Sequence, residues 1–144
     1  MVNNVEQVDP REVQMLQQYL NDYSQQIEYY SRQFEIIEQR RFESLAAIDT
    51  LKALDETGND TVLLPLGGGA SLRVRILDQK KVLLNIGADV VVERENNDVI
   101  TYLQDRITEM EAIEKKLSAS VEHVQKQAGE VARRIDSAYQ QSQR

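Results

Sequence analysis

Thr61 to Arg94 read TVLLPLGGGASLRVRILDQKKVLLNIGADVVVER, and this segment decides the fold of the chain. It is rich in Val, Leu and Ile, and from Leu72 to Ile76 apolar residues alternate with arginines. Alternation with a period of two is typical of strands that are half-buried in a sheet. The segment therefore predicts a small β block. The sequence on both sides of it carries a longer, helical period.

We expect four strands in the block, at residues 62–66, 71–77, 82–86 and 90–93. Gly67 to Gly69 separate the first two strands and Gly87 separates the last two, so two antiparallel hairpins fit the sequence. Pro65 has no backbone N–H to donate, which predicts an edge position or a bulge in the first strand.

Two hairpins cannot cover both of their faces or their open edges, and isolated hairpins are only marginally stable in water. We therefore expect partner chains to complete the sheets through the apolar strand residues. The residues of this predicted assembly interface are Val62, Leu64, Leu66, Leu72, Val74, Ile76, Val82, Leu84, Ile86, Val90 and Val92.

A heptad repeat precedes the β block and predicts a helix over residues 9–57. Asp9 and Pro10 suit a helix cap and a first helical position, and Gly58 suits the left-handed residue that ends a helix. Side chains at alternating spacings of three and four form one stripe, the seam of a coiled coil. The seam consists of Val13, Leu16, Leu20, Tyr23, Ile27, Tyr30, Phe34, Ile37, Arg41, Ser44, Ile48 and Leu51.

A second helix is predicted over residues 97–144. Asn96, Asn97 and Asp98 offer capping oxygens and a negative charge at its start. Because the two helices are similar in length and joined by a compact segment, they bury both stripes most simply as an antiparallel coiled coil. The second seam is Ile100, Leu103, Ile107, Met110, Glu114, Leu117, Val121, Val124, Ala128, Val131, Ile135 and Ala138.

Arg41 and Glu114 are the charged interruptions of the two seams. Two registers satisfy antiparallel pairing, and they set Arg41 level with Met110 or with Leu117. In both registers Arg41 lies within about a turn of Glu114, so the two side chains are predicted to pair and to fix the register. The alternative is that each long side chain extends to water on its own.

The composition excludes several classes of function. The chain has 24 acidic and 17 basic residues and a net charge of −7, so it lacks the basic stripe of a nucleic-acid binder. It has no Cys for a disulfide or a thiolate metal site. No stretch resembles a signal peptide or a membrane-spanning helix. We expect one domain over residues 1–144, of mostly α class with a small β part, in the cytoplasm and with no membrane or nucleic-acid partner.

No motif predicts catalysis, a cofactor or a metal. The run Gly67 to Gly69 is followed by neither Lys-Ser/Thr nor a helix, so a hairpin is favoured over a phosphate loop. His123, the single histidine, lies on the outer side of the second helix between seam residues. The carboxylates alternate with Lys and Arg on exposed helix faces, where no pocket would desolvate them. The sequence does not predict an enzyme.

The end of the helix pair away from the β block is the candidate binding site. Helix ends fray, and apolar seam residues at a fraying end are intermittently exposed, so they can bind apolar segments of other proteins. An ordinary, fully packed coiled-coil end is the alternative. The candidate residues are Val5, Val8, Val13, Leu16, Leu20, Val131, Ile135 and Tyr139.

LLPLGGG (Leu63 to Gly69) and VLLNIGADVVVER (Val82 to Arg94), set between long heptad helices, resemble the archaeal-type prefoldin α-subunit family. Two hairpins indicate the α class, because β-type subunits of the family have one. The resemblance implies an ATP-independent holding chaperone. Two α-type and four β-type subunits would join their hairpins into a hexamer, hold unfolded client proteins between the coiled-coil ends, and pass them to a group II chaperonin. The alternative function is a structural scaffold whose helix ends dock one dedicated partner.

Overall fold

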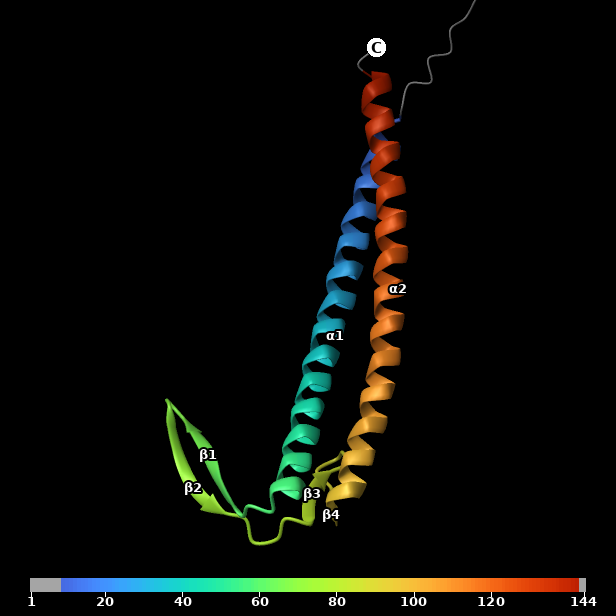
Figure 1. Cartoon of the computed structure of the whole chain (residues 1–144). Helices are drawn as coiled ribbons and strands as arrows, with labels where there is room; N and C mark the ends of the chain where they lie inside the picture. The colour runs from blue at the N-terminus through green and yellow to red at the C-terminus, as the bar shows by residue number, and fades with distance from the viewer. Residues whose placement is uncertain (1–8, 143–144) are drawn as a thin grey trace, which may run out of the picture. The chain divides into compact units, whose positions relative to one another are not determined.

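The computed structural model describes residues 9–142 of the chain. It confirms the predicted fold class, in which two long helices precede and follow two antiparallel β-hairpins along the chain (Figure 1). The elements in chain order are α1 (Pro10–Thr57), β1 (Thr61–Gly67), β2 (Ala70–Arg75), β3 (Lys81–Asn85), β4 (Val91–Glu95) and α2 (Asn96–Ser142).

Both ends of α1 lie at the capping residues from which they were predicted. Asp9 caps the first turn, because its side-chain Oδ1 accepts a hydrogen bond from the backbone N–H of Arg11 at 2.9 Å. At the other end Gly58 adopts a φ of 60° and its N–H donates to the carbonyl of Leu54 at 3.3 Å. A residue in this left-handed conformation closes the last turn and stops the helix.

The chain forms two compact units. Within the described residues the first unit comprises 9–38 of α1 and 112–142 of α2, and the second comprises 39–111 with both hairpins. In the first unit the helices run antiparallel, because Gln17 contacts Tyr139 while Phe34 lines the same groove as Val121. The start of α1 therefore lies beside the end of α2.

The seam residues of both helices are buried or half-buried, as the heptad pattern predicts. The most buried among them are Leu16, Ile48, Ile107, Met110, Val124, Ile135 and Ala138. Val99, in the first turn of α2, is 2% exposed although it lies outside the predicted seam. Most of the apolar stripe is thus packed within the chain, and the flanks of each helix face outward.

The first hairpin pairs β1 with β2, with Leu64 opposite Leu72. Its register shifts between Pro65 and Gly67, which confirms the bulge predicted from the missing proline N–H. Gly68 (φ 60°) and Gly69 (φ 81°) form the two-residue loop. Positive φ at both positions matches the twist of the strands and favours glycine.

Two strand ends differ from the prediction by two residues, and the other strand boundaries agree with it to within one residue. We expected the second strand to continue to Leu77, but β2 ends at Arg75. The N–H of Ile76 donates to the carbonyl of Asp60, one residue before β1 begins, so no strand residue remains to pair with Leu77. The fourth strand was expected to end at Glu93. It continues to Glu95, which pairs with Lys81, and α2 follows without a loop.

Candidate functional site

The two hairpins expose much of their apolar surface. Each is a two-stranded sheet, so each strand has one edge that no other described strand pairs. Of the predicted interface residues, Leu64, Leu66, Leu72, Ile86 and Val90 are exposed. The other six, which are Val62, Val74, Ile76, Val82, Leu84 and Val92, are half-buried.

Further apolar side chains on these strands were not part of the predicted interface. Leu63 and Leu83 point to the opposite face from their neighbours and are 66% and 72% exposed. Apolar residues at consecutive positions, as in 62–64 and 82–84, are the sequence signal for a strand that becomes covered on both faces. Both faces of each hairpin are therefore available for assembly.

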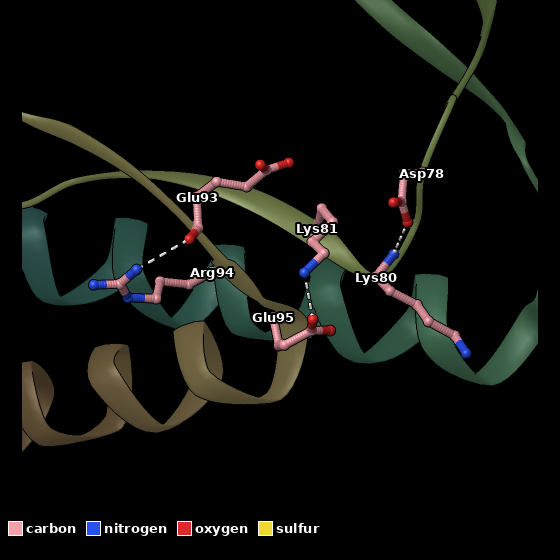
Figure 2. Close-up of polar contacts among 6 residues, drawn as sticks. All are labelled: Asp78, Lys80, Lys81, Glu93, Arg94 and Glu95. Atoms are coloured by element: carbon pink, nitrogen blue, oxygen red, sulfur yellow. Dashed lines mark hydrogen bonds and ion pairs between the residues drawn. The ribbon is translucent and has the colours of Figure 1, made fainter.

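Figure 2 shows the polar contacts around the paired strands β3 and β4. The Lys81 ammonium donates to the Glu95 carboxylate at 2.5 Å, and these residues are directly opposite in the register. The hydrogen bond and charge of Glu95 raise the pKa of Lys81 above its usual value. Asp78 accepts a hydrogen bond from the backbone N–H of Lys80 at 2.9 Å, which forms the turn before β3.

Asn96 connects the end of the second hairpin to α1 and to the segment before β3. Its side chain is buried, and Nδ2 donates to the carbonyls of Leu51 in α1 (3.2 Å) and Gln79 before β3 (3.5 Å). Its backbone N–H donates to the carbonyl of Lys80 at 2.8 Å. Two carbonyl acceptors determine that the amide nitrogen, rather than the oxygen, faces them.

The expected capping role of the Asn96 side chain is therefore wrong. Its Oδ1 has no hydrogen-bond partner among the described residues. The physical reason is that β4 continues directly into α2. Asn96 is the first residue of the helix, and its backbone N–H still bonds to Lys80, next to the β3–β4 pair. Its amide joins three backbone segments instead of satisfying the first helical N–H groups.

The predicted binding end lies in the first unit. Leu16 and Ile135 are buried there, and Val13, Leu20 and Val131 are half-buried. Tyr139 is 51% exposed, and its hydroxyl accepts a hydrogen bond from the Gln17 amide at 3.3 Å. Val5 and Val8 lie outside the described residues.

Other exposed apolar side chains accompany Tyr139 in this unit. They were not predicted as binding residues. The signal that identifies them is their place in the heptad, at positions c and g beside the seam rather than in it. They are Met15, Tyr19, Tyr29, Ile36 and Ile113.

Arg41 and Glu114 are both half-buried, as expected for seam positions. Arg41 belongs to the second unit and Glu114 to the first. The Arg41 guanidinium carbon lies 4.9 Å from the centre of the Phe42 ring, within the range of a cation–π contact. Pairing of Arg41 with Glu114 stays a prediction.

Within residues 9–142, no three His, Asp or Glu side chains gather closely enough to hold a metal ion, and His123 is exposed. Neither helix in the described part of the chain combines the length and apolar character that would let it cross a membrane.

Sequence comparison places these features among known proteins. A family model described as Prefoldin subunit matches residues 11–141. A Prefoldin subunit alpha of Methanoculleus marisnigri is 57% identical over 135 residues, which cover 94% of this chain and 91% of that relative. A Prefoldin subunit alpha of Methanoregula boonei is 48% identical over 135 residues, covering 94% of this chain and 88% of the relative.

The fold also resembles a solved structure, filamentous PFD from Methanocaldococcus jannaschii determined by cryo-EM. The TM-score is 0.68 and the sequences are 21% identical, with 80% of this chain and 96% of that chain covered. Identity this low supports a shared fold of helices and hairpins.

Proposed function

The chain belongs to the prefoldin family as a subunit of the alpha type, and from this premise we propose that it is part of an ATP-independent holdase that binds unfolded proteins. It is a chaperone subunit and not an enzyme. We further propose that the holdase works in the cytoplasm and delivers its clients to a group II chaperonin.

Assembly through the hairpins is the first part of the proposal. Unpaired strand edges and exposed Leu63, Leu64 and Leu83 favour association with further strands, which supply both hydrogen bonds and apolar cover. We propose that β-type subunits provide these strands, in a hexamer of two α-type and four β-type chains. The interface would include the eleven strand residues predicted from the sequence.

Client binding is the second part, and one observation carries it: the helix pair of the first unit buries its seam and still exposes large apolar side chains. Met15, Tyr19 and Tyr139 lie where the start of α1 meets the end of α2. Burial of such side chains against an unfolded chain is favourable and needs no defined sequence. The seam residues Leu16 and Ile135 would join this surface only when the helix ends open.

Aggregation of a chemically unfolded protein, followed by light scattering after dilution, tests the holdase. We expect the complex with β-type subunits to suppress aggregation and M15Q/Y19Q to weaken the suppression. Removing two half-exposed apolar contacts corresponds to roughly 1.5–3 kcal/mol, or about tenfold or more in the concentration required. F42Q/L45Q removes exposed side chains from the same helix in the second unit and serves as the control.

The same assay also distinguishes the holdase from the alternative function, a structural scaffold. A wild-type complex that gives no protection would contradict the holdase and favour a scaffold that docks one dedicated partner. Equal protection by M15Q/Y19Q and wild type would contradict the placement of the client surface alone. Deletion of the residues before Val13 and after Val131 then tests whether the helix ends contribute at all.

A further inference from the structure

A groove lies between α1 and α2 in the first unit. It is on the side of the seam opposite to the exposed side chains at heptad positions c and g, which are Met15, Tyr19, Tyr29, Ile36 and Ile113. Half-buried Phe34 and Val121, both seam residues, form its apolar floor. Ser31 and Ser118 border the floor at heptad position e. Position e flanks the seam, and a serine there is too small to cover the floor, so the groove stays open.

Three carboxylates line the same groove: Glu35 and Glu38 from α1, and Glu122 from α2. No Lys, Arg or His lines it. Within residues 9–142 none of these three carboxylates makes an ion pair, whereas Glu28, which lies outside the groove, is paired with Arg32 at 2.7 Å. An apolar floor is therefore bordered by three carboxylates that make no ion pair with the described part of the chain.

We propose that this groove binds client segments in which Lys or Arg stands beside apolar residues. The proposal rests on the holdase function and adds a chemical preference to it. The aliphatic stem of Lys or Arg can lie along Phe34 and Val121 while the charged head reaches the carboxylates. An Arg head can also make bidentate hydrogen bonds with a glutamate.

Two other occupants fit the groove less well. A second copy of this chain would bring the same three carboxylates to the interface, where like charges repel. A metal ion would need several carboxylates converging on one point, and the described residues include no such cluster. A cationic and apolar polypeptide segment satisfies both the floor and the charge.

Peptide binding to the complex of this chain with β-type subunits tests the preference. Three fluorescein-labelled 12-residue peptides would share their Leu positions and carry Lys, Gln or Glu between them, with affinities measured by fluorescence anisotropy. We expect the affinity to decrease in the order Lys, Gln, Glu. Raising the salt concentration should weaken only the binding of the Lys peptide, because exposed charge pairs are screened.

The groove variant E35Q/E38Q/E122Q removes the charge and keeps the shape. Exposed ion pairs contribute modestly one by one, so we expect the Lys peptide to bind about three- to tenfold more weakly and the Gln peptide to be unaffected. S118R is a second variant, which places a cation of the chain's own in the groove. It should reduce binding of the Lys peptide while the helices stay folded by circular dichroism.

The matched control is D22N/E130Q/D136N, which removes three exposed carboxylates of the same unit that do not line the groove. Equal losses in the groove and control variants would show nonspecific attraction and overturn the proposal. So would equal binding of the Lys and Gln peptides, or self-association that disappears in the groove variant. Failure of the holdase is a separate result, because the wild-type complex would then protect no client, including one poor in Lys and Arg.

Discussion

Replacing Asn96 by Asp tests whether this buried amide joins the hairpin to the helices. The two side chains have the same shape, but Asp places an oxygen where Nδ2 donates to the carbonyls of Leu51 and Gln79. At neutral pH the substitution removes both hydrogen bonds and directs a negative charge at two carbonyl oxygens. Asn96 is 5% exposed, so water cannot solvate that charge.

The expected loss of stability follows from the burial of the side chain at position 96. An uncompensated charge in a buried site destabilises a protein by about 3–5 kcal/mol. Burial and the carbonyl oxygens disfavour the ionised form, so the pKa of Asp at position 96 should be higher in the folded chain than its ordinary value of about 3.9. The folded state then holds a proton that the unfolded state has lost, and stability falls as pH rises through this window. Below about pH 3.9 the protonated side chain can donate one hydrogen bond, and most of the loss should disappear.

Urea unfolding followed by circular dichroism at 222 nm measures the difference between variant and wild type at each pH, at fixed protein concentration. N97D is the matched control, because Asn97 is the next residue and is exposed. A carboxylate in the first turn of a helix is stabilising by about 0.3–1 kcal/mol, so N97D should be neutral or slightly more stable at pH 7. Equal stability of N96D and N97D at pH 7, or a loss in N96D that does not shrink in acid, would refute the reasoning.

Four further predictions concern the hairpins and the seam. G68V should destabilise the chain by about 1–2 kcal/mol in urea unfolding, because residue 68 has a positive φ that side chains disfavour. A88G should stabilise it by about 0.5–1 kcal/mol, because Ala88 is held at a φ of 50° without being glycine. Since the pKa of Lys81 is raised, its ion pair should contribute below pH 10.5 and be lost as pH rises through the folded-state pKa, so an NMR titration should give a midpoint above 10.5. A double-mutant cycle of R41A and E114A should give a coupling of about 1 kcal/mol, and additive effects would contradict the predicted pair.

The helices and their seam could be predicted because the heptad spacing allows only one face of each helix to carry the continuous apolar stripe. Residues that recur at three and four must share a face, so the burial of Leu16 and Ile135 follows from spacing alone. The bulge at Pro65 was equally local, since it depends on a single missing N–H. These features require no knowledge of which segments meet.

Asn96 and the groove depend on contacts between distant segments, and that is why the sequence did not reveal them. Asparagine before a helix usually indicates a cap, and only the carbonyls of Leu51 and Gln79 give this one a different role. Likewise, Ser31 and Ser118 are ordinary helix residues until antiparallel packing brings them to the same groove. In each case the local pattern is compatible with several structures, and the distant segment that it contacts determines which one forms.

The heptad also separates what holds the helix pair together from what the pair offers to other molecules. Positions a and d are buried or half-buried in the seam, so most of a binding surface has to come from the flanks on its two sides. On one side, positions c and g of α1 expose Met15, Tyr19 and Ile36; on the other, positions b and e present Glu35 and Glu38 beside an apolar floor. Each flank can be altered without disturbing the packing that orders the helices. A client with both apolar and basic segments would contact both sides of the unit, and its binding should then weaken in steps as the two flanks are changed separately and together.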